Sequence, residues 1–461
     1  MHIYKYIICI LALPLVLLSC RKDPADSDSN PVFYNPYWTE ATHGGGMADY
    51  VTVFPDQQVN RIEIVLGSEK WNSIRNDMQT LTGSDFGSMA TPEDLPSNTE
   101  PVYVEGMVTF QGKKWRNVGF RLKGNKGLSY AWNKGCYKLP FRLNFDKWED
   151  RYPGIKNQHF YGFEELSFSP GYKDASLIRE KLANDAFREA GIVSPRTAFY
   201  AVYVDIGDGL KYWGLYNMLE LPEDNMIKNQ FGENNGNVYK PISHLSFFNQ
   251  VAFEKKNNFE SLDYNDVNEF VNLLNSNLRI SNYNQWKTEM ESRVDIDKFL
   301  HWLAVSNAIV NQNCYGNSEG NYYLYHHSLN GFSWIPWDNN ETFKGNPGVV
   351  SAPGSGQDGL SLSMNEITSN WPLVRYLIDD PAYTQIYKTH LRNFYNQQMN
   401  SGWLDTKIDA YHSLVTPYVT GPNGEQVNYT YLNNADEFLI EKNNLHSHLL
   451  NRSYYIQLFI P

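Results

Sequence analysis

Residues 321–343, NYYLYHHSLNGFSWIPWDNNETF, constrain the fold of this chain more than any other stretch. Two aromatic-rich runs flank Asn330-Gly331, and Asn-Gly between such runs predicts a β-hairpin. In an antiparallel pair the first strand begins beside the end of the second, so Asn321 and Asp338 are predicted to meet at the open end. Carboxylate and amide oxygens suit a hard cation such as Mg²⁺. The alternative is that Asp338 only caps a following turn.

The charge of the chain excludes one class of partner. The 461 residues carry 39 basic and 51 acidic side chains, a net charge of −12. This argues against a nucleic-acid partner, because phosphates need a basic face. Aromatic residues make up 15 % of the chain, which is high. An aromatic-rich core is one explanation, and a surface that contacts a partner such as carbohydrate is the other.

The N-terminus has the features of an export signal. Residues 1–20 contain an early lysine, an apolar run too short to span a membrane, and a final Leu-Leu-Ser-Cys that resembles a bacterial lipobox. Cys20 is therefore predicted to carry the lipid of an exported lipoprotein, at the cell surface or in the periplasm, with the lipid as its only membrane contact. An ordinary signal peptide with an incidental cysteine is the alternative. Residues 21–50 are polar and rich in Pro and Gly, which predicts a flexible tether.

The remaining chain changes character near residue 221. The first third alternates apolar and polar residues, which predicts mostly antiparallel strands, and 174–192 form the clearest helix. Residues 197–221 predict another hairpin, whereas the later part is mostly helical apart from the hairpin at 321–338. The fold class is therefore α+β and bilobal, with an N-lobe over about 51–220 and a C-lobe over about 221–461. Cys136 and Cys314 are predicted either as a disulfide or as two buried free thiols.

Several motifs in a fixed order resemble the CotH family, the spore-coat protein H kinases. They are VGFRLKGN, YKLPFRLNF, LIREKLANDAFREAGIVSPRTAFYAVYV, YWGLYNMLE, GNVYK and NYYLYHH…WIPWD. The resemblance runs from about residue 51 to at least 345. It implies an atypical protein kinase fold and transfer of the γ-phosphate of ATP to Ser or Thr, with Mg²⁺ or Mn²⁺. Family members also serve as coat-assembly or surface-interaction proteins.

The resemblance also implies roles for individual residues. By position, Asp338 matches the metal-binding acid and Asn321 the Asn of NYYLY, a second metal ligand. The implied nucleotide-binding residues are Arg121, Lys123, Gly124, Asn125, Lys138, Glu180 and Glu220. Lys138 is expected to face phosphates, Glu180 to supply the acid of a kinase-like Lys–Glu pair, and Glu220 to lie near the nucleotide cleft. The alternatives are solvated surface roles for the charged residues, a simple turn for Gly124-Asn125, and capping for Asn321.

Two departures from the family pattern bear on catalysis. The family places an Asp in the loop before the hairpin, whereas this chain has Asn313, and a carboxamide cannot accept a proton near neutral pH. Lys126-Gly127 stand where small hydroxyl residues are common. Two hypotheses follow: a weak, metal-dependent kinase, or a silent pseudokinase that binds a protein, glycan or nucleotide. A hydrolase is disfavoured, because the sequence has neither Gly-x-Ser-x-Gly nor His-Glu-x-x-His.

Overall fold

The computed structural model describes residues 37–91, 93–96, 99–345 and 359–460, which belong to one compact unit. The predicted signal peptide, Cys20 and most of the predicted tether lie outside the described residues. The tether prediction is wrong for residues 37–50, where α1 (Glu40–His43) forms and α2 (Tyr50–Val53) begins. His43 is buried and stacks on Trp115 with ring centroids 4.4 Å apart, so this stretch packs on the folded unit.

The first part of the chain forms a closed barrel, in the order β1-β2-β3-β4-β5-β7-β6. The strands are β1 (Asn60–Val65), β2 (Val104–Phe110), β3 (Lys113–Leu122), β4 (Phe141–Asn144), β5 (Glu165–Ser169), β6 (Thr197–Asp205) and β7 (Lys211–Leu219). Neighbours are antiparallel except β1 and β6, which close the barrel in parallel. Phe120, Phe141 and Phe168 stack inside it. The predicted antiparallel strands are confirmed, and their closure leaves the alternate, polar residues on the outside.

A second sheet lies in the later part of the chain, in the order β11-β10-β8-β9. Its strands are β8 (Val238–Pro241), β9 (Phe253–Lys255), β10 (Tyr322–His327) and β11 (Gly331–Pro336). The predicted hairpin is confirmed, because Tyr322 pairs with Pro336 and His327 with Gly331. Its loop is residues 328–330, and Gly331 has φ +73°. A Cβ at Gly331 would lie 2.1 Å from Arg293 O, so only glycine fits there.

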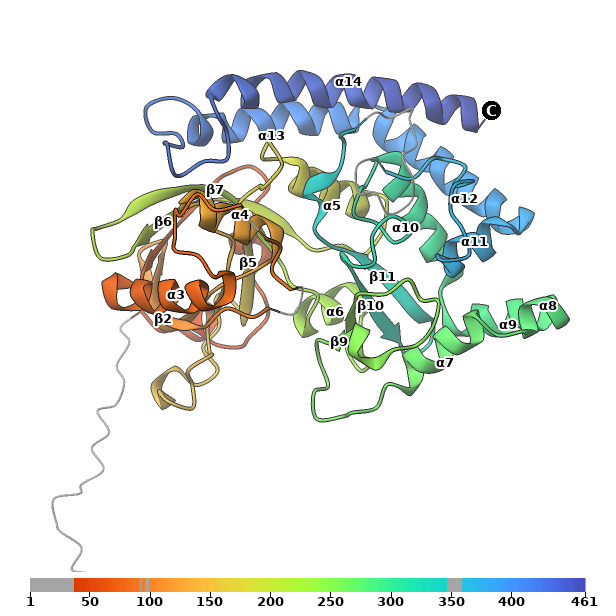
Figure 1. The fold of residues 1–461 in the computed structure, drawn as a ribbon, viewed down its shortest axis with the longest axis horizontal. Helices are drawn as coiled ribbons and strands as arrows, with labels where there is room; N and C mark the ends of the chain where they lie inside the picture. Colours follow the sequence, from red (N-terminus) through yellow and green to blue (C-terminus); the bar gives the residue numbers. More distant parts are fainter. Residues whose placement is uncertain (1–36, 92, 97–98, 346–358, 461) are drawn as a thin grey trace, which may run out of the picture. The chain divides into compact units, whose positions relative to one another are not determined.

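The helices mostly follow the barrel in sequence (Figure 1). Those associated with the barrel are α3 (Gly67–Thr82), α4 (Lys126–Lys134) and α5 (Arg179–Glu189). The later ones are α6 (Asp224–Phe231), α7 (Asn265–Leu274), α8 (Leu278–Ser281), α9 (Tyr283–Arg293), α10 (Ile296–Ala308), α11 (Pro372–Ile378), α12 (Pro381–Phe394), α13 (Trp403–Val419) and α14 (Ala435–Phe459). Among the described residues, no helix combines the length and apolarity needed to cross a bilayer.

The predicted bilobal α+β organisation is confirmed. β7 ends at Leu219 and α6 begins at Asp224, and this junction between the barrel and the later helices is called the seam below; the predicted bounds of the two lobes stay a prediction. One buried cluster fills the barrel, and a larger one joins α10 to the helices around it. α5 precedes the seam in sequence, yet its apolar residues pack into the larger cluster. Cys136 and Cys314 are both buried free thiols, so the second of the two alternatives holds.

Candidate active site

The open end of the β10–β11 hairpin is held in a strained conformation. Asp338 has φ +59° and Asn321 has φ +64°, in the left-handed region that Asp and Asn tolerate best among non-glycine residues. Val310, which follows α10, has φ +52° although it is β-branched. Such backbone strain persists only where surrounding structure enforces it, and it is concentrated at functional sites.

Asp338 and Asn321 come together through their backbones. The Trp337 N–H donates to Asn321 O at 3.2 Å, which extends the hairpin ladder by one residue. This register places Asn321 opposite Trp337 rather than opposite Asp338. Within the described part of the chain, no side-chain hydrogen bond links the Asp338 carboxylate to the Asn321 amide. Joint metal binding by the two side chains therefore stays a prediction.

Glu180 is placed beside Asp338 by the start of α5. Asp174 accepts hydrogen bonds from the Ser176 N–H (3.0 Å) and the Arg179 N–H (2.9 Å), which fixes where the helix begins. Glu180, next in sequence, is only 1 % exposed and accepts from the Asn184 side chain at 2.9 Å. The side chain of Asn339, the residue after Asp338, donates to the same Asn184 at 3.3 Å. The alternative of an exposed, solvated Glu180 is therefore wrong.

Lys123 completes a group of three charges with Glu180 and Asp338. It follows the last residue of β3 and is partly exposed, and no acid lies within ion-pair distance of it in the described residues. Burial and then the charge of Arg142 lower the pKa of Lys123 to about 8, against the opposing charges of Asp338 and Glu180. Burial and then the charge of Asp338 raise the pKa of Glu180 to about 8. Burial also raises the pKa of Asp338, and Lys123 opposes that rise.

The outside of the barrel next to Lys123 is a polar wall with unsatisfied groups. Arg121 pairs with Arg142 across β3 and β4, and Arg142 pairs with Ser167 across β4 and β5, so these side chains share one face. On this wall, buried atoms without a hydrogen-bond partner within the described structure include the Nε atoms of Arg121 and Arg142, Oδ1 of Asn144 and Asn217, and Oγ of Ser167; Oε2 of Glu180 in α5 is another. Buried polar atoms are normally satisfied, so this wall has the chemistry of a surface that receives a polar ligand.

Asn313 lies at the same place but is already engaged. Its side-chain amide donates to the backbone oxygen of Asp338 at 2.9 Å, and its own N–H donates to the Asn311 side chain at 2.9 Å. Asn311 in turn donates to Asn339 at 3.1 Å, and Asn339 donates to Asn184 at 3.3 Å. Asn313 therefore positions the backbone of Asp338 and has no carboxylate with which to accept a proton.

Gly124 and Asn125 lead into a helix that local sequence patterns did not predict. Gly124 has φ +89°, and the Asn125 side chain accepts from the Lys126 N–H at 2.6 Å where α4 begins. A Cβ at Gly127 would lie 3.1 Å from the ring of Tyr172, so this departure from the family pattern allows a close approach. Lys126 faces Asp94 at 3.6 Å, on the surface. The sequence signal for α4 was weak because it is short and follows a glycine.

Arg121 lies on the polar wall of the barrel, but its guanidinium is paired with a residue outside the group of Lys123, Glu180 and Asp338. Its guanidinium forms an ion pair with Glu100 at 2.8 Å and lies 4.8 Å from the centre of the Tyr103 ring. The Arg121 side chain is largely buried, whereas that of Glu100 is mostly exposed. Because the partner is an exposed acid, the ion pair is weakly held and an anionic ligand can compete for the arginine.

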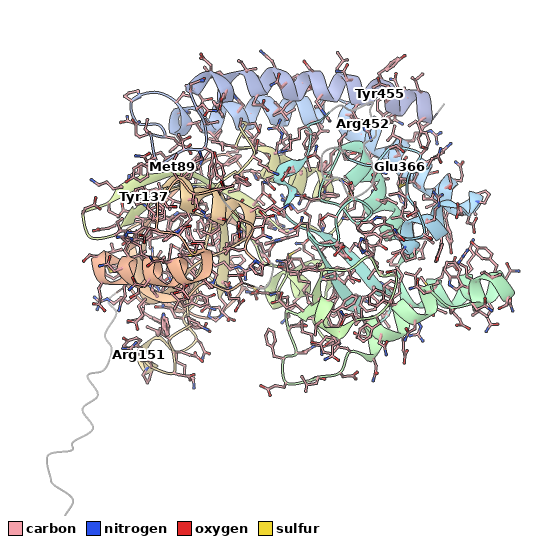
Figure 2. All side chains as sticks on the ribbon, in the orientation of Figure 1. Met89, Tyr137, Arg151, Glu366, Arg452 and Tyr455 are labelled. Atoms are coloured by element: carbon pink, nitrogen blue, oxygen red, sulfur yellow. The ribbon has the colours of Figure 1, made fainter. Side chains whose placement is uncertain are left out.

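The C-terminal helices hold α5 in place. Arg179, next to Glu180, pairs with Glu441 of α14 at 2.5 Å, and the Tyr411 hydroxyl of α13 donates to Asp185 of α5. Arg452, labelled in Figure 2, donates to Asn307 O of α10 at 2.6 Å. The first two contacts tie the last hundred residues to α5, the helix that carries Glu180, and the third ties them to α10.

Lys138 does not join the Lys123 group, so its predicted role facing phosphates is wrong. It precedes β4 rather than lying in a strand, and it pairs with Glu425, with both side chains at most 1 % exposed. Glu425 also accepts from the Leu215 N–H at 2.9 Å, and the Tyr431 hydroxyl donates to Lys138 O at 2.7 Å. Lys138 thereby anchors residues 420–434, which connect α13 to α14, onto the barrel.

Aromatic stacking also fastens residues 420–434 to the barrel. Tyr137, labelled in Figure 2, stacks on Tyr429 with ring centroids 5.1 Å apart, and its N–H donates to Asn428 O at 2.7 Å. Sequence reasoning missed this, because Lys138 and Glu425 are separated by most of the chain and neither lies in a periodic pattern.

Lys138→Met is expected to destabilise the protein by about 3–5 kcal/mol, because it leaves Glu425 buried without its counter-charge. Urea unfolding would measure the loss. Lys70→Met, which breaks a surface pair with Glu69, is the matched control and is expected to change stability by less than about 1 kcal/mol. Similar losses for both variants would contradict the buried-pair interpretation.

Glu220 is also engaged away from Lys123, which corrects the prediction that its side chain faces a nucleotide. It is 1 % exposed, and its two oxygens accept from the Tyr50 hydroxyl at 2.6 Å and the Arg196 N–H at 3.0 Å. It therefore fastens α2 to the end of the barrel. Burial raises the pKa of Glu220 to about 7, against the two hydrogen bonds.

This pKa predicts a pH dependence of stability. Between the ordinary glutamate pKa of about 4.5 and about 7, folded Glu220 keeps a proton that the unfolded chain has released, so the free energy of unfolding falls as pH rises. Glu220→Gln cannot titrate. The free energy of unfolding of the variant minus that of wild type is expected to be about 2 kcal/mol larger at pH 7 than at pH 5, because wild type loses stability over this range. Urea unfolding at both pH values measures this, and a constant difference would contradict it.

The described residues hold no group of three or more His, Cys, Asp or Glu side chains able to bind a metal by themselves. Mg²⁺ normally takes one or two carboxylates and leaves its other positions to water and phosphate oxygens. Asp338, with Glu180 behind it, has the donor chemistry for such a shared site.

Comparison with known proteins agrees with the motifs. A family model described as CotH kinase protein matches residues 120–456. Inner spore coat protein H of Bacillus subtilis (strain 168) is 25 % identical over 314 residues, which are 65 % of this chain and 79 % of that protein. The crystal structure of a Helicobacter pylori proinflammatory kinase, CtkA, aligns with a TM-score of 0.32 and 11 % identity, over 70 % of this chain and 92 % of that one. Because the family model spans well over half of the sequence, this protein belongs to the CotH kinase family.

Proposed function

We propose that this protein binds ATP with Mg²⁺ or Mn²⁺ and transfers the γ-phosphate slowly to a Ser or Thr hydroxyl of an exported or surface protein. The observation that carries the proposal is the convergence of Lys123, Glu180 and Asp338, which come from the end of β3, the start of α5 and the end of β11. Burial disfavours the charged form of each of these three side chains. A ligand with both a metal cation and a polyanion would supply an opposite charge for the two acids and for the lysine.

The residues have distinct roles in this proposal. Asp338 binds the metal, which when bound neutralises the charge of the β- and γ-phosphate oxygens. Lys123 contacts phosphate oxygens, and Glu180 contributes negative charge near Lys123. The unsatisfied atoms of the polar wall, such as the Ser167 hydroxyl and the Asn217 amide oxygen, are available to the rest of the nucleotide. Positioning and electrostatics supply most of the catalysis of phosphoryl transfer, so such a site functions without a strong base.

Asn313 determines the expected rate. In the transfer, the bond between the γ-phosphorus and the ADP oxygen breaks, a bond to the acceptor oxygen forms, and the hydroxyl proton leaves to water. A carboxylate at position 313 would accept this proton, and general-base catalysis is typically worth about 10²–10⁴-fold. The amide at 313 instead donates to Asp338 O, so the proposed enzyme is slow.

The second candidate function is a pseudokinase that binds nucleotide, a protein or a glycan without transfer. The engaged amide of Asn313 is the observation that favours it. The location proposed for either function is outside the cytoplasm, with a lipid on Cys20 as the only membrane contact and no nucleic-acid partner. The lipobox-like Leu-Leu-Ser-Cys and the net charge of −12 support this part of the proposal.

Labelled ATP with Mg²⁺ or Mn²⁺ tests the proposal, with the purified protein itself and a mixture of exported proteins as acceptors. Metal-dependent labelling of Ser or Thr that needs Asp338 is the expected result. Binding of ATP without any labelling would favour the pseudokinase, and no binding at all would exclude both nucleotide functions.

A further inference from the structure

We propose that Lys240 of β8 is a second phosphate-contacting residue, which reaches the polyphosphate end of the bound ligand from the side opposite Lys123. This inference rests on the proposed nucleotide site and adds to it a residue from the C-lobe. Lys240 is the last residue of the GNVYK motif, and the family resemblance implied no role for this lysine.

The strand register places Lys240 on the sheet face that leads to Asp338. Val238 pairs with Tyr325 of β10, and directly opposed residues share a face. Lys240 lies two residues after Val238, so it points the same way. That face carries a buried cluster that includes Tyr323 and Trp337. Trp337, whose ring centroid lies 5.3 Å from that of Tyr323, immediately precedes Asp338.

The opposite face of the same sheet has a different character. Tyr239, the neighbour of Lys240, packs into the large C-lobe core. The cluster on the Lys240 face instead includes Leu219 and Leu221, at the seam between the lobes. Lys240 therefore projects from the C-lobe sheet towards the seam, where the barrel wall carrying Arg142 also lies.

Lys240 is a partly buried cation without a counter-charge. Among the described residues, no acid lies within ion-pair distance of it, and its side chain makes no hydrogen bond. Its strand neighbour Glu254 pairs with Lys256 instead. Burial, and then the charges of Arg142 and Lys256, lower the pKa of Lys240 to about 8, while Glu254 and Asp338 oppose. Unpaired buried charge destabilises a fold, so its presence calls for a ligand.

The groups opposite Lys240 identify the kind of ligand. The charge of Lys240 lowers the affinity of Lys123 for a proton, and the charge of Arg142 acts on both lysines, so the two face a common space. Arg142 is paired with Glu165 at 3.0 Å, but its Nε is buried without a partner. Lys123 and Lys240 both act on the acid Asp338, and this mixture of cations and a carboxylate matches a polyphosphate with a divalent metal better than it matches a single carboxylate.

Titration calorimetry with the purified full chain tests the inference, using ATP, AMP and inorganic triphosphate, each with Mg²⁺. Lys240→Met keeps the length of the side chain and removes its charge. It is expected to weaken ATP and triphosphate about 10- to 100-fold and to leave AMP within about 3-fold. Lys240→Arg is expected to recover most of the loss. Because an unpaired charge is removed, the Met variant is expected to melt no earlier than wild type.

Lys255→Met is the matched control. Lys255 lies on the adjacent strand, and its ammonium donates to Ser261 O at 2.9 Å instead of facing Asp338. This variant is expected to bind ATP as wild type does. Unchanged ATP affinity in Lys240→Met, or an equal loss for AMP and ATP, would overturn the inference.

The nucleotide proposal and this inference fail in different ways. Triphosphate binding that depends on Lys240, without ATP binding, would leave the anion site standing and remove the nucleotide function. ATP binding that is unchanged by Lys240→Met would support the nucleotide function and remove the role proposed for Lys240. A wild-type protein that binds neither ATP nor triphosphate would overturn both.

Discussion

Asp338→Asn is expected to reduce metal-dependent phosphate transfer by at least about 10³-fold, because it removes the acid that binds the metal. Asparagine is the better replacement than alanine. Asp338 has φ +59°, which asparagine tolerates, whereas alanine would add backbone strain to the loss of charge. The amide also removes a charge that burial disfavours, so the variant is expected to stay folded.

The measurement is incorporation of labelled phosphate under single-turnover conditions, with circular dichroism to confirm the fold. Asp409→Asn is the matched control, since Asp409 pairs with Lys442 on the surface of the α13–α14 pair. It is expected to transfer phosphate as wild type does. Equal transfer by wild type and Asp338→Asn would remove Asp338 from the mechanism.

Asn313→Asp is expected to increase phosphate transfer by about 10²-fold or more, because it supplies the missing base where the family has one. The change has a cost. The Asn313 amide donates to Asp338 O at 2.9 Å, and a carboxylate cannot donate this bond, so a loss of about 1–3 kcal/mol in stability is expected. The gain should appear in the rate of transfer at saturating ATP and leave the affinity for ATP largely unchanged.

Asn313→Ser separates the two effects of that change, because serine also loses the amide bond but adds no base. It is expected to lower stability without raising activity. If Asn313→Asp binds ATP with the wild-type affinity and still transfers nothing, the missing base is not what limits the protein, and the pseudokinase becomes the better proposal.

Local patterns in the sequence predicted much of the fold. Alternation of apolar and polar residues placed the barrel strands, and the aromatic runs around Asn330-Gly331 placed the hairpin whose far end carries Asp338. These features depend on neighbours within a few residues, which is why periodicity reveals them. Helix α4 was missed, because nine residues after a glycine give little periodic signal. Motif order indicated the family, and the family model confirms it.

The candidate site was only partly predictable, as the lysines demonstrate. Lys123, Lys138 and Lys240 all stand in or beside strand-like stretches, and nothing local distinguishes them. Lys138 is paired with Glu425, from a segment almost 300 residues later, whereas Lys123 and Lys240 have no such partner among the described residues. A charged residue's role depends on which distant groups burial brings next to it, and the chain does not encode that locally.

By itself, the sequence therefore determined the strands, the main helices and the acid at the hairpin's end, because short-range backbone preferences and side-chain periodicity are local. Only the tertiary structure decided that Lys123 rather than Lys138 stands with Glu180 and Asp338, that Glu220 fastens α2, and that the last hundred residues hold α5. Those outcomes depend on long-range pairing of buried charges, since an ionic group removed from water must find its partner wherever the fold places one.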